Sequence, residues 1–250
     1  GHPAWIVFGG LLVAVAGYLC SRQVPAAPPP VPDLRISLNP ISETWNNIAH
    51  ARQNRTVFLS ILGISWFWLY GAMFLAQFPA YAKDVLGGGE NTVTLLLAIF
   101  TVGIGLGSLL CERMSGRLVE IGLVPFGSIG LTLFGIDLYF ASPVGLASGS
   151  PHDLLALLSL PAIWRVLFDL MMLGVFGGFF IVPLYALVQI RSAPEQRARI
   201  IAANNILNAL FMVAGALTAA SVLGAGLSIP ALFGFAALLN AAVAIYIYGL

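Results

Sequence analysis

The sequence predicts an all-α membrane protein with seven membrane-spanning helices. Of its 250 residues, 59% are hydrophobic and only 8% are charged, which leaves too few polar side chains to cover a soluble domain of this size. A helix needs about 20 apolar residues to cross the hydrocarbon core of a membrane, and seven apolar runs of about that length are present. Lipid cannot satisfy backbone N–H and C=O groups, so each run is expected to form its own hydrogen bonds as a helix.

The seven predicted spans are residues 4–20, 56–80, 92–110, 121–141, 164–189, 200–223 and 228–248. These spans divide the chain into three parts. The first span is short and follows almost directly on Gly1 without a methionine, which predicts that the chain is part of a longer protein. We expect residues 1–20 to form a truncated helix, residues 21–55 a segment outside the membrane, and residues 56–250 a unit of six helices.

Positive charges predict the orientation of the spans, because Lys and Arg near span ends remain in the cytoplasm. Only Lys83 and Arg165 lie in or beside connections on one side. The other basic residues fall in the alternate connections: Arg22, Arg35, Arg52, Arg55, Arg113, Arg117, Arg191, Arg197 and Arg199. We therefore expect segment 21–55 and the C-terminus to be cytoplasmic.

Segment 21–55 is predicted to contain a linker and a short amphipathic helix. Five prolines within residues 24–32 indicate a stiff, extended linker. Asn39 is a suitable N-cap and Pro40 a suitable first residue for a helix. The apolar face of this helix would carry Ile41, Trp45 and Ile48. Such a helix either lies in the membrane interface or docks on cytoplasmic loops.

Local signals also predict helix ends and helix packing. Pro79 should end the second span, and Ser192 with Glu195 has the S-x-x-E spacing of a capping box before the sixth. Small residues in the third span predict close packing against another helix, because they let two backbones approach. They are Gly103, Gly105 and Gly107.

The sequence has none of the common catalytic or cofactor-binding signatures. Its only lysine, Lys83, is not part of a phosphate-binding loop, and its three histidines and two cysteines lack metal-ligand spacing. No basic cluster with interleaved aromatic residues indicates nucleic-acid binding. We therefore expect no enzymatic activity in this chain, no cofactor, no metal and no nucleic-acid partner.

Three ionisable residues lie within or beside the predicted spans, where charges are costly and often functional. They are Asp137, Arg165 and Asp169, which the predicted topology places at a similar depth. Arg165 and Asp169 are spaced i,i+4 and could pair on one helix face. Either this cluster binds a charged headgroup or latches a gate, or Arg165 reaches the interface and its neighbours neutralise it.

The sixth predicted span carries a second group of polar residues. Asn204 and Asn208 fall on one helical stripe with Phe211 and Gly215, and Asn205 lies beside it. Carboxamides in hydrocarbon need hydrogen-bond partners, which either a neighbouring helix or a polar substrate can provide.

One stretch resembles the loop motif of the major facilitator superfamily. Residues 107–117 read GSLLCERMSGR, and the residues that match the motif are Gly107, Glu112, Arg113, Gly116 and Arg117. The stretch departs from the motif by one extra residue between Glu112 and Gly116 and by Glu in place of the usual Asp. The order of one span, a long cytoplasmic segment and six spans also resembles the second part of such a transporter.

Three further stretches, together with this one, resemble the bacterial lysophospholipid transporters. They are VEIGLVPFGSIG (residues 119–130), GGFFIVPLYALVQ (residues 177–189) and SAPEQRARIIAANNILNALFMV (residues 192–213). The resemblance implies a six-helix C-terminal half of a major facilitator superfamily transporter, preceded by the last helix of the N-terminal half. It also implies inward movement of lysophospholipid, chiefly lysophosphatidylethanolamine, across the bacterial inner membrane.

The resemblance further implies partners and site residues. The expected partners are the membrane lipid, the missing N-terminal half of the same chain, and a fused or separate acyltransferase. In this family the first, second, fourth and fifth helices of each half line the cavity, which favours Arg165, Asp169, Asn204 and Asn208 as substrate-binding residues. Asp137 would lie on a peripheral helix as a structural charge. The alternatives are a facilitator for another small solute or drug, and a membrane anchor for a fused acyltransferase.

Overall fold

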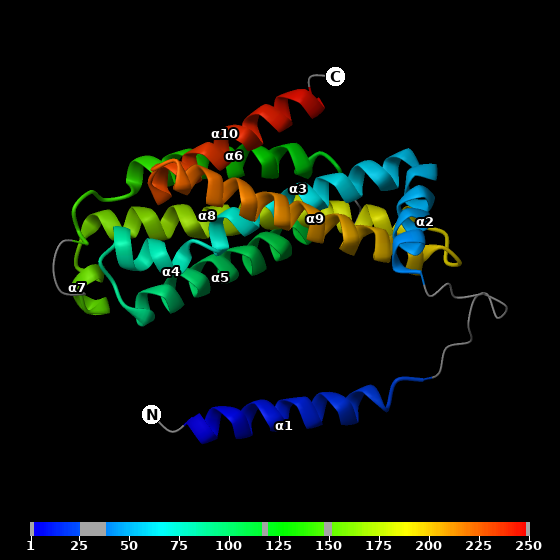
Figure 1. Ribbon diagram of the computed structural model, residues 1–250, viewed down its shortest axis with the longest axis horizontal. Helices are drawn as coiled ribbons and strands as arrows, with labels where there is room; N and C mark the ends of the chain where they lie inside the picture. Colours follow the sequence, from blue (N-terminus) through cyan, green and yellow to red (C-terminus); the bar gives the residue numbers. More distant parts are fainter. Residues whose placement is uncertain (1–2, 26–38, 117–119, 148–151, 249–250) are drawn as a thin grey trace. The chain divides into compact units, whose positions relative to one another are not determined.

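The computed structural model describes residues 3–25, 39–116, 120–147 and 152–248, which form two units (Figure 1). The first unit, Gly1–Ile36, contains α1 (Pro3–Ser21), whose apolar portion Val7–Ser21 is shorter than the other apolar helices. The second unit, Ser37–Leu250, contains the remaining helices. The predicted proline-rich linker and Arg117 lie outside the described residues.

Among the described residues of the second unit, six helical segments are long and apolar enough to cross a membrane, as the sequence predicts. They are Arg55–Val85 (α3, α4 and η1), α5 (Glu90–Met114), α6 (Leu123–Ala141), α8 (Pro161–Arg191), α9 (Arg197–Gly224) and α10 (Ile229–Tyr248). Two shorter helices accompany them, α2 (Pro40–Gln53) and α7 (Leu154–Leu158). The described part of the chain contains no strands, and the protein is a multi-pass all-α membrane protein.

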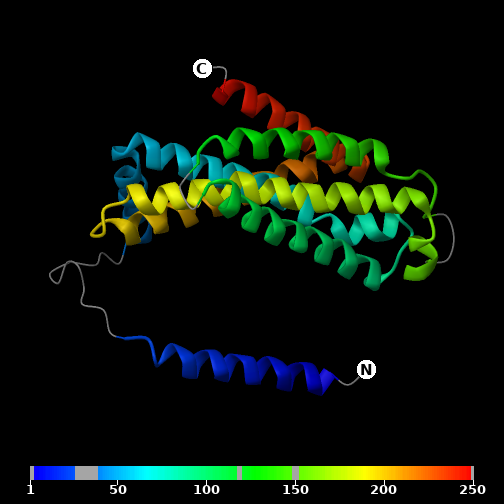
Figure 2. The same cartoon turned by 180° about the vertical axis from the view of Figure 1, so that it is seen from behind.

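The long helices run side by side in alternating directions, so the second unit has two ends (Figures 1 and 2). The α2 end holds α2, the starts of α3, α6 and α9, and the ends of α5, α8 and α10. The α7 end holds α7, η1 and the opposite helix termini.

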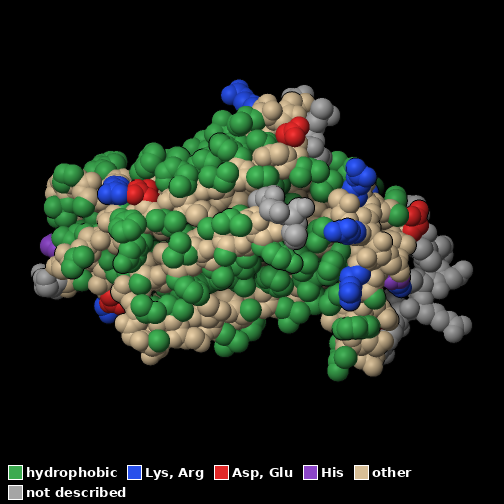
Figure 3. All heavy atoms as spheres, turned by 90° about the horizontal axis from the view of Figure 1, so that it is seen from above, with side chains coloured by type: hydrophobic (Ala, Val, Ile, Leu, Met, Phe, Trp, Pro, Cys, Tyr) green, Lys and Arg blue, Asp and Glu red, His purple; other side chains and the backbone are tan. Residues whose placement is uncertain are grey.

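Hydrophobic side chains cover most of the face seen in Figure 3, and basic side chains gather mainly toward α2. The middle of the unit therefore presents an apolar surface suited to lipid.

Helix α8 is the centre of the packing. It contacts α5 on one side and α6 on another, and it also contacts α3. Helix α3 packs mainly against α9, and α6 packs against α10. Aromatic rings fill much of the interior, including stacked rings of Phe74 and Phe233 with centroids 4.5 Å apart. Each of the six segments therefore has at least one close helical neighbour.

Glycines bring the backbones of α5 and α8 into direct contact. A Cβ at Gly103 would lie 2.3 Å from the Met171 carbonyl oxygen, and a Cβ at Gly107 would lie 2.1 Å from that of Val175. Gly174 on α8 approaches α5 equally closely. Only residues without a side chain permit this distance between two helices. Gly105, which lies between the two α5 glycines, has no other heavy atom within 4 Å of its added Cβ and does not contribute.

The second predicted span differs from the expectation at Pro79. Helix α3 (Arg55–Leu75) ends before the proline, and Pro79 lies in the first turn of α4 (Phe78–Ala80). The chain then continues into a π-helical turn, η1 (Tyr81–Val85). Proline lacks a backbone N–H and disfavours helical geometry in the residue before it, so the break falls upstream of Pro79 and the helical path resumes after it.

Helix α2 packs on α9 and α3, so it is docked on the bundle. Its N-cap is Asn39, whose side chain accepts hydrogen bonds from the N–H groups of Ile41 at 3.1 Å and Ser42 at 3.3 Å. Ile48 packs against the core, whereas Ile41 and Trp45 are exposed. The predicted apolar face is therefore divided between the protein and the surface.

The predicted capping box before α9 is wrong. The residue before the helix is Gln196, and no side chain caps the helix start. The hydroxyl of Ser192 donates to the carbonyl of Val188 at the end of α8 instead. Ser192 thus serves the preceding helix, because its hydroxyl reaches the carbonyl one turn earlier.

Candidate functional site

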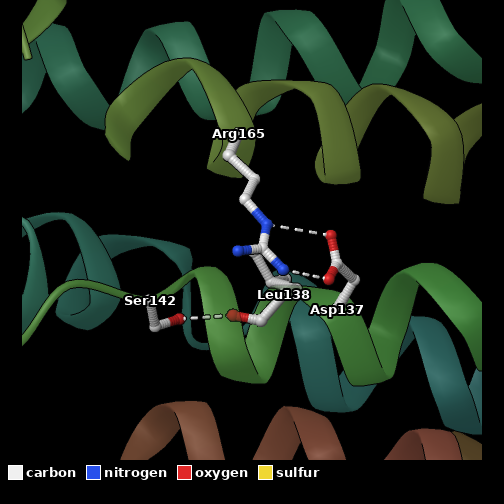
Figure 4. Close-up of polar contacts among 4 residues, drawn as sticks. All are labelled: Asp137, Leu138, Ser142 and Arg165. Carbon is white, nitrogen blue, oxygen red and sulfur yellow. Dashed lines mark hydrogen bonds and ion pairs between the residues drawn. The ribbon is translucent and has the colours of Figure 1, made fainter. Parts of the chain in front are cut away.

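An ion pair joins α6 and α8 near the α7 end. The Nε of Arg165 donates to Oδ2 of Asp137 at 3.1 Å, and a terminal guanidinium nitrogen donates to Oδ1 (Figure 4). This two-point contact fixes the relative orientation of both groups. The side chains are 53% and 39% exposed, so a ligand can reach both charges from outside the bundle.

A chain of hydroxyl groups anchors η1 to the end of α6 beside this pair. Ser142 donates to the carbonyl oxygen of Leu138 at 2.6 Å (Figure 4). The hydroxyl of Tyr81, a fully buried residue of η1, lies 2.8 Å from the Ser142 hydroxyl. Because the Ser142 proton is already donated to Leu138, Tyr81 acts as the donor to Ser142.

Asp169 lies one turn beyond Arg165 on α8 and is fully buried, with 0% of its surface exposed. Neither of its carboxylate oxygens accepts a hydrogen bond from the residues that the structure describes. Its carboxyl interacts electrostatically with Asp137, Arg165 and Tyr81.

The intrahelical pair of Arg165 and Asp169 that the spacing allows is not formed, because Arg165 pairs with α6. Asp137, expected to be a peripheral structural charge, is the residue that Arg165 contacts.

The two predicted asparagines on α9 have different surroundings. Asn208 is buried and accepts a hydrogen bond from the Ser65 hydroxyl of α3 at 2.9 Å, which joins the two helices. Asn204 is also buried, and its amide nitrogen donates to Asn205 at 3.4 Å. The amide oxygen of Asn204 has no hydrogen-bond partner in the described part of the chain.

A further polar network connects α3, α6 and α10 and was not predicted. The indole Nε1 of Trp66 donates to Oδ1 of Asn240 at 2.9 Å. The Asn240 amide in turn donates to the Ser128 carbonyl at 3.0 Å and to the Thr132 hydroxyl at 2.9 Å. Asn240 is the only carboxamide in the last span, and its need for partners in hydrocarbon was the signal that could have revealed this network.

This network borders a cavity of about 720 Å³ near the α2 end. Its wall is mainly apolar and comes from α3, α6, α8 and α10, with Phe211 from α9. None of the four predicted substrate-binding residues lines it. The cavity therefore lies in a different part of the bundle from the charged cluster of Asp137, Arg165 and Asp169.

The described residues of the loop motif lie in the last part of α5 and directly after it. Gly107 is the contact point with α8, and Gly116 adopts a positive φ of 58° just after the helix ends. Glu112, Arg113 and Gly116 line a shallow hollow on the surface. Glycine favours this left-handed conformation, so Gly116 suits the helix end.

The chain is similar to a lysophospholipid transporter, LplT, of Escherichia fergusonii. The two sequences are 32% identical over 140 residues, which make up 56% of this chain and 30% of the relative. The match thus spans less than a third of the relative's own length. No protein-family model and no solved structure matches the chain. The similarity and the apolar helices together support a membrane transporter.

Proposed function

We propose that this chain is the C-terminal half of a transporter that moves lysophospholipids across a membrane. The observation that carries the proposal is the similarity to a lysophospholipid transporter in a chain with six apolar helices. In this proposal α3–α10 form one half of a major facilitator superfamily fold, and α1 is the last helix of the other half.

The charged cluster suits the headgroup of lysophosphatidylethanolamine, which carries a phosphate and an ammonium. The guanidinium of Arg165 is a planar double donor that matches phosphate oxygens. The carboxylate of Asp137 beside it suits the ammonium. Both side chains are exposed enough for a headgroup to reach them. Asn204 and Asn208 lie toward the other end of the bundle and offer polar contacts along the path, with an amide oxygen of Asn204 unpartnered among the described residues.

The proposed orientation follows the distribution of charge. Arginines gather at the α2 end, so this end faces the cytoplasm of the bacterial inner membrane. The headgroup is then captured at the opposite, outer face and delivered inward by alternating access between the two halves. Reacylation by a fused or separate acyltransferase follows in the cytoplasm.

The test is uptake of labelled lysophosphatidylethanolamine by spheroplasts that express the full-length protein containing this chain. Arg165→Gln removes the phosphate-binding charge and should abolish most of the uptake, and Asn204→Leu should reduce it. Arg197→Gln, which changes an exposed arginine at the α2 end, is the matched control and should retain uptake.

All variants are compared at equal abundance in the membrane. Uptake by the wild type at background level would disprove the proposal, and wild-type uptake that is unaffected by Arg165→Gln would remove this cluster from the pathway.

A further inference from the structure

Asp169 is an acid in a place where a bare negative charge is strongly disfavoured. It is fully buried within a membrane-spanning helix, and no donor among the described residues reaches either oxygen. Removing a carboxylate from water is costly unless hydrogen bonds or an opposite charge compensate it. The nearest compensating charge, Arg165, is committed to Asp137.

The charged and titratable groups near Asp169 are few. Asp137 faces it from α6, Arg165 from its own helix and Tyr81 from η1. Two other helices that contact α8 add little. Helix α7 has no ionisable residue. The only ionisable residue in the membrane part of α3 is Tyr70, which donates a hydrogen bond to the Leu131 carbonyl. The ionisable residues of α5 lie near its two ends: Glu90, Cys111, Glu112 and Arg113.

The balance of charge in this cluster indicates where a proton resides. Two neighbouring carboxyl groups share a single guanidinium, and two adjacent carboxylates do not both remain ionised when water is excluded. Asp137 is exposed and holds the guanidinium at two points, whereas Asp169 is buried and has no donor. A proton on Asp169 makes the cluster neutral. The protonated Asp169 can then donate a hydrogen bond to the Asp137 carboxylate.

We propose that Asp169 is a proton-binding site, and that it keeps its proton when Arg165 and Asp137 bind the phosphate and the ammonium of a lipid headgroup. The second part rests on the proposed function. In the structure as described, Arg165 pairs with Asp137 and Asp169 carries the proton. When the headgroup binds, Arg165 takes its phosphate and Asp137 takes its ammonium, while Asp169 remains protonated.

The charges balance in both states. Before binding, the guanidinium and one carboxylate cancel and Asp169 is neutral. After binding, the phosphate cancels the guanidinium, the ammonium cancels the Asp137 carboxylate, and Asp169 is still neutral. The cluster therefore holds no net charge in either state as long as Asp169 keeps its proton.

Infrared spectroscopy of the purified chain tests the proton site without any lipid ligand. A protonated carboxyl absorbs apart from ionised carboxylates, so the wild type should show a protonated-carboxyl band at neutral pH. Asp169→Asn should lose this band, and Asp169→Glu, which retains a carboxyl, should shift it. Asp84→Asn, which changes an exposed acid of η1, is the matched control and should keep it.

Circular dichroism verifies that each variant retains its helices. Absence of the band in the wild type, or its survival in a helical Asp169→Asn variant, would overturn the assignment.

Measurement of proton release on ligand binding tests the second part, in the full-length protein and in weakly buffered solution with a pH-indicating dye. Lysophosphatidylethanolamine should bind to the wild type without release or uptake of a proton.

The outcomes separate the two proposals. Binding of lysophosphatidylethanolamine with release of about one proton overturns the second part alone. Failure of this lipid to bind overturns the second part and the proposed function together, whereas the infrared result still decides whether Asp169 holds a proton.

Discussion

Replacement of Gly107 by alanine should separate α5 from α8 and destabilise the bundle. The added Cβ would lie 2.1 Å from the Val175 carbonyl oxygen, whereas ordinary van der Waals contact begins at 3.4 Å. The helices would therefore need to move apart by roughly 1.3 Å, because a backbone carbonyl cannot rotate away as a side chain can.

The expected loss combines two opposing effects. Overpacking of this kind costs about 1–3 kcal/mol. Alanine gains about 0.5–1 kcal/mol over glycine in a helix. The net loss is centred on about 1 kcal/mol, which corresponds to a fall in Tm of about 2–4 °C for a chain of this size.

A thiol-reactive fluorogenic dye can follow the opening of this helix pair during heating. Cys111 lies one turn beyond Gly107 on α5 and is buried, so it reacts only when the packing opens. Cys20 is exposed and is replaced by serine in all samples. Gly105→Ala is the control on the same helix, since its added Cβ meets nothing within 4 Å, and its Tm should equal or exceed that of the parent. Equal Tm values for Gly107→Ala and Gly105→Ala would refute the reasoning.

Two further predictions concern the polar contacts between helices. Asn240→Leu removes hydrogen bonds that join three helices and should cost about 1–3 kcal/mol, seen as a lower Tm and a change in tryptophan fluorescence, whereas the exposed Asn91→Leu should have little effect. A double-mutant cycle of Ser65→Ala and Asn208→Ala, measured by thermal unfolding, should give a coupling energy of about 0.6 kcal/mol. Zero coupling would show that the Asn208 amide contributes nothing to the contact between α3 and α9.

The spans could be predicted from the sequence because hydrocarbon imposes a simple rule. A long apolar run must form a helix, so all six long helices of the second unit appear close to their expected positions. Helix ends follow weaker and more local preferences, and here the prediction was less successful. The break before Pro79 falls at Leu75, and the S-x-x-E signal at Ser192 does not cap α9. The position of a helix end depends on which of several nearby carbonyl groups accepts a hydrogen bond from a side chain or a backbone amide.

Contacts between helices could not be predicted from spacing alone. Span order gives the depth of a residue in the membrane, and it predicted a similar depth for Asp137 and Arg165, which agrees with their ion pair. It does not give the rotation of each helix or its neighbours, so the i,i+4 partner Asp169 and the interhelical partner Asp137 were equally compatible with the sequence. The packing of α8 on α6 decides between them. Trp66 and Asn240 lie 174 residues apart in the sequence, and the packing of the helices likewise brings them into contact.

The central place of α8 has a consequence for biosynthesis. Helices α5 and α6 leave the ribosome before α8 does, and both have their closest packing against it. Until α8 is inserted, the glycine surface of α5 faces lipid tails, which fill its groove less well than a matching helix. The bundle is therefore assembled around a late-arriving segment, and a chain that stops before residue 161 lacks the partner that joins its earlier helices.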